Sequence, residues 1–193
     1  LNNFLKKLNI KFPYQFESIK DMIFPLISKP LTGSGSKNIF LYKKKNELPS
    51  KLEKSFIYQR FIKGQEYGLD ILNDFDGRFV SYCLKKKIEM RSGETDKAIT
   101  VNNKRVLNLS KKISQNLRHI GNLDCDLIID KNNNIFILDF NCRFGGGYPF
   151  THSVGHNFIE YLINQKLGLK NSKFPLKYKE KFIAKGIKIF NDY

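Results

Sequence analysis

Apolar and polar residues alternate most clearly between residues 135 and 143, where the pattern predicts a β-strand with two different faces. One face is apolar and consists of Phe136, Leu138, Phe140 and Cys142. The other face begins with isoleucines and then carries Asp139, Asn141 and Arg143. Unpaired buried polar and charged groups are costly, so a carboxylate, an amide and a guanidinium in succession predict a bound partner. Mg²⁺ suits the two oxygen donors, and a phosphate oxygen suits the arginine.

The segment before this strand supports a metal site. Residues 124–129 alternate like a second strand, and residues 130–134 have the composition of a turn. If the loop consists of residues 131–134, Asp126 lies directly opposite Asp139, and two facing carboxylates repel unless a cation lies between them. The alternative is a solvent-facing edge hairpin whose acidic residues are incidental. The hydrophobic alternation indicates a half-buried hairpin and therefore favours the metal.

Strands and helices are expected along the rest of the chain. Strands are predicted at residues 24–30, 38–42, 55–62, 65–72, 78–84 and 183–190. Helices are predicted at residues 1–8, 15–22, 48–54, 106–120 and 157–166. Gly121 is expected to act as the C-cap of the helix over 106–120. The basic run 85–91, with the following loop 92–95, leaves two interpretations open, an exposed cationic loop and an anion-binding loop.

Composition and charge limit the classes of function. The chain has 193 residues and is 41% hydrophobic, which excludes a disordered protein, and 34 Lys and Arg against 18 Asp and Glu give a net charge of +16. Such a charge fits nucleic acid, a membrane surface, an anionic substrate or a general compositional bias. Three isolated cysteines argue against zinc and against a disulfide scaffold. Without a signal peptide or an apolar run long enough to cross a membrane, we expect a cytoplasmic protein.

A second candidate site lies near the start of the chain. Pro30 holds Lys29 in an extended conformation, and the glycines and serines of residues 32–36 follow. The backbone N–H groups of such a hairpin can close over phosphates, although a plain turn has the same composition. The spacing of residues 33–37 differs from that of a P-loop.

The order of these motifs resembles the ATP-grasp superfamily, in particular the large chain of carbamoyl-phosphate synthetase and its small stand-alone relatives. The resemblance covers about residues 10 to 155 and rests on Lys29-Pro30, the Gly/Ser hairpin, residues 59–66, Asp126 and residues 139–143. It implies an α+β fold in which two lobes with antiparallel sheets clamp ATP between them. It also implies ATP and two Mg²⁺ ions as cofactors, with Mn²⁺ as an alternative ion.

The resemblance also assigns roles to individual residues. The nucleotide ligands would be Lys29 on the phosphates, Gly35 and Ser36 in the phosphate-covering loop, Gln59 on the adenine amino group, Phe61 and Ile62 through their backbone, and Glu66 on the ribose. The metal ligands would be Asp126, Asp139 and Asn141, with Asp139 bridging two ions. Arg143 would hold a phosphate, and Arg91 would lie near the transferred phosphate.

Two residues depart from the family pattern. The bridging metal ligand is usually glutamate, whereas this chain has Asp139, which is one methylene shorter. The residue that faces adenine is also usually glutamate, and Gln59 keeps the acceptor oxygen that this contact needs. Both substitutions are compatible with the chemistry.

These expectations combine into one hypothesis for the domains and the function. Residues 1–22 would be a linker and helices belonging to an upstream nucleotide-fold-like domain absent from this sequence, residues 23–62 the small lobe, and residues 63–193 the large lobe with the metal site. The domain would ligate a small carboxylate to an amine through an acyl phosphate, as a monomer or homodimer, without nucleic acid or membrane. Because the sequence begins at Leu1 in a predicted helix, we expect these residues alone to ligate nothing. A basic nucleic-acid-binding module and a catalytically inactive ATP-grasp relative are the alternatives.

Overall fold

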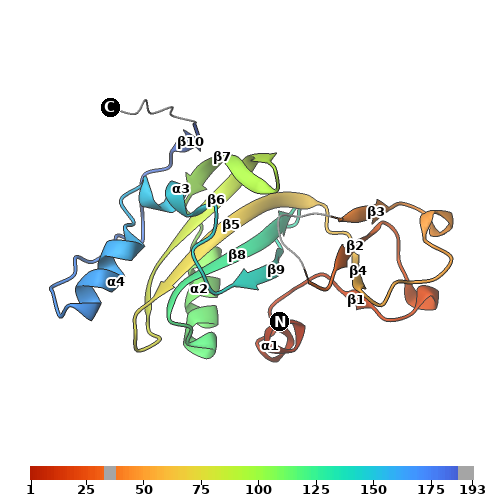
Figure 1. The fold of residues 1–193 in the computed structure, drawn as a ribbon, viewed down its shortest axis with the longest axis horizontal. Helices are drawn as coiled ribbons and strands as arrows, with labels where there is room; N and C mark the ends of the chain where they lie inside the picture. The colour runs from red at the N-terminus through yellow and green to blue at the C-terminus, as the bar shows by residue number, and fades with distance from the viewer. Residues whose placement is uncertain (33–37, 187–193) are drawn as a thin grey trace, which may run out of the picture. The chain divides into compact units, whose positions relative to one another are not determined.

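The computed structural model describes residues 1–32 and 38–186. The chain divides into two compact units, which we call unit 1 (residues 1–65 and 127–139) and unit 2 (residues 66–126 and 140–193). The predicted α+β class is confirmed, because two antiparallel sheets are combined with short helices (Figure 1). No helix in the described part of the chain is both long and apolar enough to cross a membrane.

Unit 1 contains a four-stranded sheet with the strand order β1-β4-β2-β3. Its strands are β1 (Gln15–Phe16), β2 (Leu26–Pro30), β3 (Phe40–Tyr42) and β4 (Phe56–Arg60). Phe16, Leu26 and Tyr58 form the buried core on one face of this sheet. Helix α1 (Asn2–Lys7) and the single 3-10 turns η1 (Ile19–Asp21) and η2 (Lys45–Glu47) complete the elements that precede β5.

Two predicted helices of unit 1 do not form. In the segment 15–22, Phe16 pairs with Tyr58 across β1 and β4, so only the turn η1 remains, and the Ser18 hydroxyl accepts from the Lys20 amide. Residues 48–54 contain no helix, because Pro49 holds Leu48 in an extended conformation with φ −70° and ψ 148°. In both segments the apolar side chains pack on the sheet instead of lining a helix.

The second sheet has six strands in the order β10-β7-β6-β5-β8-β9 (Figure 1). Its strands are β5 (Gly64–Asn73), β6 (Phe79–Arg91), β7 (Glu94–Val101), β8 (Gly121–Asp130), β9 (Ile135–Asn141) and β10 (Phe182–Ala184). The loop conformation expected for residues 85–91 is wrong, since this run is the second half of β6 and pairs with β7, whereas anion binding by its basic residues stays a prediction. The sequence pattern did not predict β7, so the run seemed to lack a partner strand.

Three helices belong to unit 2, namely α2 (Lys104–Leu117), α3 (Tyr148–His152) and α4 (Phe158–Lys166). Helix α2 begins two residues before its predicted start because Asn103 caps it, accepting from two backbone amides. It ends at Arg118, which takes the left-handed conformation with φ 49°, so the expected C-cap at Gly121 is wrong. Gly121 instead begins β8, and the chain leaves the helix early because His119 is buried against the Ile71 carbonyl, with Nε2 at 3.2 Å from it.

Candidate functional site

Two predicted nucleotide ligands lie on the same face of the sheet in unit 1. In the register of β2 and β4, Gln59 pairs with Ile27, and Lys29 pairs with Ile57. Directly paired residues share a face, so Lys29 and Gln59 both lie opposite the face that carries Leu26 and the core. The structure therefore brings the predicted phosphate lysine and the predicted adenine contact to one surface.

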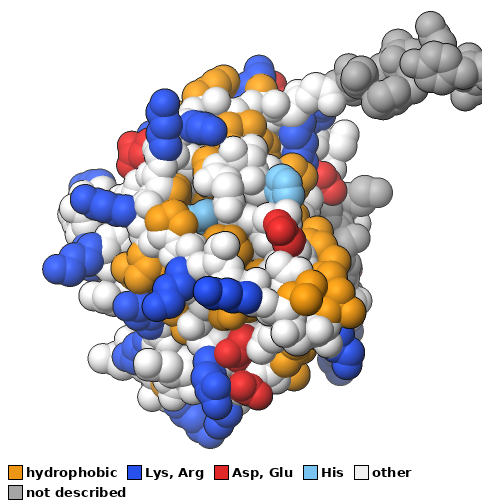
Figure 2. Space-filling view, turned by 90° about the vertical axis from the view of Figure 1, so that its left-hand side faces the viewer, with side chains coloured by type: hydrophobic (Ala, Val, Ile, Leu, Met, Phe, Trp, Pro, Cys, Tyr) orange, Lys and Arg blue, Asp and Glu red, His pale blue; other side chains and the backbone are white. Residues whose placement is uncertain are grey.

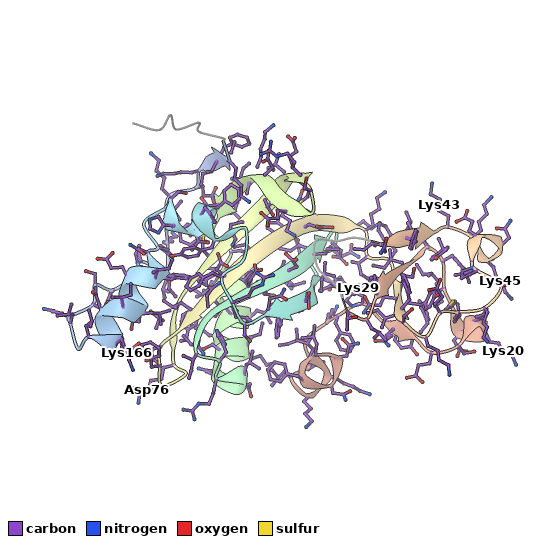
Figure 3. All side chains as sticks on the ribbon, viewed as in Figure 1. Lys20, Lys29, Lys43, Lys45, Asp76 and Lys166 are labelled. Carbon is purple, nitrogen blue, oxygen red and sulfur yellow. The ribbon has the colours of Figure 1, made fainter. Side chains whose placement is uncertain are left out.

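Lys29 is also separate from the exposed lysines of unit 1. Figure 3 shows Lys29 on β2, whereas Lys43 and Lys45 follow β3 and lie away from it, as does Lys20. Lys43 and Lys45 are exposed, while Lys29 is partly buried. Gly35 and Ser36, the predicted residues of the phosphate-covering loop, lie outside the described residues.

The other predicted adenine contacts, Phe61 and Ile62, follow β4 and line a cavity of about 490 Å³ in unit 1. Aromatic residues, Arg60 and Lys63 complete much of its wall. The Phe61 amide donates to the Pro25 carbonyl at 3.1 Å, so this amide is already used within the fold. Gln59 does not line this cavity, and the predicted adenine contacts are thus divided between two places.

Charged residues follow one face of β5 and β6 in unit 2, and we call this surface the polar face. In the register of these strands, Gly68 is paired with Lys85 and Asp70 with Cys83, which places Glu66 across from Lys87. A half-buried strand normally turns apolar side chains inward, whereas this face carries an acid or a base at most positions. The polar face is the strongest candidate for a site in unit 2.

Lys87 joins two of the predicted ligands on the polar face. Its ammonium nitrogen lies 2.8 Å from Oδ1 of Asp126 and 3.7 Å from Oε2 of Glu66. Glu66 is the predicted ribose ligand, and Asp126 is a predicted metal ligand. One ammonium contacts both carboxylates, so the two predicted ligands belong to the same cluster.

A buried ion pair also lies on the polar face of β5 and β6, next to the cluster around Lys87. Lys85 and Asp70 form a salt bridge, and their side chains are 2% and 0% exposed. Asp70 also accepts hydrogen bonds from the Thr151 hydroxyl of α3 and, at 3.2 Å, from the Asn122 amide of β8. Burial, the largest single effect, lowers the pKa of Lys85, but the charge and hydrogen bond of Asp70 together with smaller contributions from Cys83 and Asp124 outweigh it and raise this pKa above its usual value. Lys85 therefore stays protonated, and the contacts of Asp70 tie β5, β6, β8 and α3 together.

Arg143, the predicted phosphate ligand, is paired with an acid that the sequence analysis did not single out. Its Nη1 donates to Oδ2 of Asp124 at 2.9 Å, and its side chain is 56% exposed. Burial, with a smaller contribution from the charge of Asp70, raises the pKa of the Asp124 carboxyl. The Arg143 carbonyl accepts from the Asn122 amide at 3.1 Å, which fixes the start of the glycine segment 145–147.

The glycines of the segment 145–147 allow the backbone to lie directly on the polar face. A Cβ atom on Gly145 would lie 2.2 Å from Oδ2 of Asp124, and one on Gly146 would lie 2.5 Å from Oε2 of Glu94. The Gly147 carbonyl lies 3.4 Å from the Lys85 ammonium. Only glycine fits at the first two positions without moving an acid.

Replacing Gly145 by alanine is expected to turn the Asp124 carboxylate away and to break its pair with Arg143. We expect a loss of about 1–3 kcal/mol in the free energy of unfolding, measured with urea, because the added methyl group overpacks a closed contact. Gly186→Ala is the control, since a Cβ atom at Gly186 meets nothing within 4 Å. If the two variants are equally stable, Gly145 is not needed for this contact.

Arg91, the predicted residue near the transferred phosphate, lies at the end of β6. Its Nη2 is 2.9 Å from Oδ1 of Asp96, and its side chain is 58% exposed. It pairs with Glu94 in the register of β6 and β7. Its predicted role stays a prediction.

The turn between β8 and β9 differs from the expected one. The Asp130 amide donates to the Asn134 carbonyl at 3.0 Å, and the Asn133 amide donates to the Asp130 carbonyl at 3.0 Å. Asn133 takes the left-handed conformation with φ 59°, so the loop has three residues and not the expected four. The premise that placed Asp126 directly opposite Asp139 is therefore wrong. Asp130 explains the tighter turn, because its carboxylate accepts from the amides of Asn132 and Asn134.

The remaining predicted metal ligands, Asp139 and Asn141, lie on β9, where Asp139 is exposed and Asn141 is partly buried. Among the described residues, no group of three or more His, Cys, Asp or Glu side chains could hold a metal ion by itself. Mg²⁺ commonly binds through one or two carboxylates together with substrate phosphates. The side chains of Asp126, Asp139 and Asn141 offer two carboxylates and one amide oxygen, and all three are at least partly exposed. These donors fit an ion of that kind.

A comparison with family models identifies the family of this chain. The model of the ATP-grasp domain matches residues 1–147. The chain belongs to the ATP-grasp family. The resemblance inferred from Lys29, Gln59, Asp126 and residues 139–143 is thereby confirmed at the level of the family. A search of curated proteins found no match.

Solved structures share the ATP-grasp fold at low sequence identity. The biotin carboxylase domain of Hydrogenobacter thermophilus 2-oxoglutarate carboxylase, solved with MgADP and bicarbonate, has a TM-score of 0.71 at 13% identity and covers 89% of this chain and 45% of that one. N5-carboxyaminoimidazole synthetase from Staphylococcus aureus has a TM-score of 0.67 at 16% identity and covers 92% of this chain and 51% of that one. L-amino acid ligase from Bacillus licheniformis has a TM-score of 0.62 at 20% identity and covers 86% of this chain and 45% of that one. This chain therefore spans about half the length of these proteins.

The structure adds residues that the sequence analysis missed. Lys85 and Lys87 were treated as part of a loop, and Asp70 and Asp124 were given no role. A signal was present, because Lys87, Glu89 and Arg91 alternate with the apolar Ile88 and Met90 in the manner of a two-faced strand. Recognising β7 as the partner strand would have made this pattern interpretable.

Proposed function

We propose that this ATP-grasp chain is an ATP-dependent ligase domain that joins a carboxylate to an amine through an acyl phosphate. The observation that best supports this proposal is the cluster of Glu66, Lys87 and Asp126, which unites a predicted ribose ligand with a predicted metal ligand. Membership of the ATP-grasp family supplies the expectation of ATP. The specific likeness to carbamoyl-phosphate synthetase is part of this proposal.

The reaction needs positioning and charge stabilisation from the protein. A carboxylate oxygen attacks the γ-phosphorus of ATP, and the bond to the β–γ bridging oxygen breaks, so that ADP leaves. The amine then attacks the acyl carbon, loses a proton and expels inorganic phosphate. Mg²⁺ bound through Asp126, Asp139 and Asn141 would supply charge neutralisation on the phosphates, and Lys29 and Arg143 would hold the phosphoryl oxygens.

The names of the neighbouring structures support a small carboxylate as the first substrate. One neighbour was solved with MgADP and bicarbonate, and another is an L-amino acid ligase. Their identities to this chain are 13% and 20%, so they support the class of substrate and not its identity.

An ADP-release assay tests the proposed function. The chain, alone and as extended by any upstream sequence, is incubated with Mg-ATP and a panel of paired carboxylates and amines, among them bicarbonate and amino acids. We expect ADP release that requires both members of a pair and a product that contains both. ADP release that is the same without either substrate, or its absence in every version of the protein, would contradict a ligase.

Replacing Gln59 by alanine is expected to weaken ATP binding more than binding of inorganic triphosphate. The Gln59 side chain is 5% exposed and lies on the same face as Lys29, so the variant would remove a contact to the base while the phosphate contact stays. Loss of one buried hydrogen-bond partner corresponds to about 1–3 kcal/mol. Calorimetry with both ligands measures the difference, and an equal loss for both would make Gln59 a structural residue.

A basic nucleic-acid-binding module remains the alternative suggested by the net charge of +16. On the face shown in Figure 2, Lys and Arg side chains are scattered among uncharged groups and do not form one continuous patch. A duplex-binding role would also leave the inward acids Asp70 and Asp124 unexplained. A steep salt dependence of binding to random duplex DNA would favour this alternative.

A further inference from the structure

The Lys87 ammonium lies deeper in the polar face than the two carboxylates that it contacts. Its side chain is 11% exposed, whereas the side chains of Glu66 and Asp126 are 51% and 42% exposed. Solvent can therefore stabilise both carboxylates without the lysine. An ordinary surface ion pair has two exposed partners and contributes little, so this arrangement calls for another explanation.

The strand register keeps Lys87 at this position. Tyr67 pairs with Lys86, so the next pair places Glu66 directly across from Lys87. Lys86 turns to the opposite face of the same strand, because successive residues of a strand alternate. Asp126 reaches the same ammonium from β8, the strand beyond β5 in the sheet, so both carboxylates hold Lys87 from the same side of β6.

We propose that Lys87 is a built-in counter-ion that occupies the cation position at Asp126 when no nucleotide is bound and must leave it before a divalent ion can bind. This proposal rests on the proposed function, since it takes Asp126 as a metal ligand and Glu66 as a ribose ligand. The proposal gives Lys87 a role that the proposed function does not include, namely to hold Asp126 until the metal and the nucleotide arrive.

Electrostatics favour the exchange. The lysine nitrogen is 2.8 Å from Oδ1 of Asp126, and a divalent ion bound to the same carboxylate would lie close to this nitrogen. An ammonium and a divalent ion so close together repel strongly, more so where water is partly excluded. The flexible stem of lysine lets the displaced ammonium turn toward the phosphates that arrive with the metal.

The exchange predicts effects of opposite sign on the two ligands. Removing the ammonium eliminates a competitor of the metal, so a divalent ion alone should bind more tightly. Removing the ammonium also eliminates a cation that can accompany the phosphates, so ATP without metal should bind more weakly. If Lys87 only stabilised the fold, its replacement would not change the affinities for the divalent ion and for metal-free ATP in opposite directions.

Lys87→Gln tests the proposal, with Lys86→Gln as the matched control. Lys86 is the preceding residue of the same strand and carries the same charge to the other face. Mn²⁺ is titrated into the nucleotide-free protein, with the free ion followed by electron paramagnetic resonance. ATP is titrated separately in the presence of a chelator and followed by calorimetry. Circular dichroism and urea unfolding check that each variant is folded, which the exposure of Glu66 and Asp126 leads us to expect.

We expect Lys87→Gln to bind Mn²⁺ about tenfold more tightly and metal-free ATP about tenfold more weakly, as for one charge–charge contact between partly buried groups. Lys86→Gln should change each affinity by less than about twofold, because Lys86 lies on the opposite face of β6, away from Asp126 and Glu66. Unchanged or weaker Mn²⁺ binding by Lys87→Gln, with normal binding by the parent, would overturn the counter-ion role and leave the proposed function in place. Absence of Mn²⁺ and Mg-ATP binding by the parent itself would overturn the proposed function, and the counter-ion role with it.

Discussion

Replacing Asp70 by asparagine is expected to lower the free energy of unfolding by about 3–5 kcal/mol, because the buried ammonium of Lys85 loses its counter-charge. Both side chains are almost completely inaccessible, so water cannot replace the missing carboxylate. The Thr151 hydroxyl and the Asn122 amide also lose a charged acceptor. Urea unfolding of the variant and the parent at neutral pH measures the effect.

Two further variants separate the buried pair from a general effect of removing acids. Glu66→Gln removes a carboxylate from the same face of β5, but Glu66 is half-exposed, so we expect a change within about 0.5 kcal/mol. In a Lys85→Met background, Asp70→Asn should cost much less than it does alone, since no buried cation is left unpaired. A loss below about 1 kcal/mol for Asp70→Asn alone would mean that Lys85 finds other partners.

The two-faced strand pattern was sufficient to predict several strands but not β7, and the order of the motifs predicted the family. The alternation over residues 135–143 identified β9, and the alternation over residues 65–72 identified β5. Both strands combine an apolar face with polar residues of defined type, and this combination is visible in the sequence itself. The positions of Lys29 and Gln59 on one face follow from strand pairing, which the same pattern implies.

Two of the failures have a common physical cause, namely contacts between residues far apart in the sequence. Lys85 looks like a surface residue because the acid that allows its burial, Asp70, lies 15 positions earlier on another strand. The helix expected at 15–22 is replaced because Phe16 finds Tyr58 on β4. Local propensity is a weak guide wherever such contacts decide the structure.

The hairpin at residues 130–134 failed for a local reason. Asp130 and Asn133 select a three-residue loop through side-chain hydrogen bonds and a left-handed backbone conformation, and the choice of loop length sets the strand register. The metal hypothesis was therefore built partly on a register that the turn does not support. What remains of it is the chemistry of the oxygen donors and the link between Asp126 and Glu66 through Lys87.

Asp139 provides the direct test of the metal hypothesis, because Asp139→Asn is expected to weaken Mg-ATP binding by at least about tenfold while the fold is kept. The variant preserves the shape of the side chain but removes the charge that a Mg²⁺ ligand needs. Asp139 is exposed, so the free energy of unfolding without nucleotide should change by less than about 0.5 kcal/mol. Calorimetry with Mg-ATP, and with ATP in the presence of a chelator, measures both affinities.

Comparing the affinities for Mg-ATP and for metal-free ATP shows whether Asp139 acts through the metal. If Asp139 is a metal ligand, its replacement by asparagine removes attraction for the metal and also removes a charge that repels the phosphates, so ATP without metal should bind equally well or better. Asp76→Asn is the control, because Asp76 is an exposed acid in the turn before β6, where it pairs with Arg78 (Figure 3). That variant should leave both affinities unchanged. Equal Mg-ATP affinity in Asp139→Asn and the parent would remove Asp139 from the metal site, and an equal loss with and without metal would assign it to the structure of β9 and not to the ion.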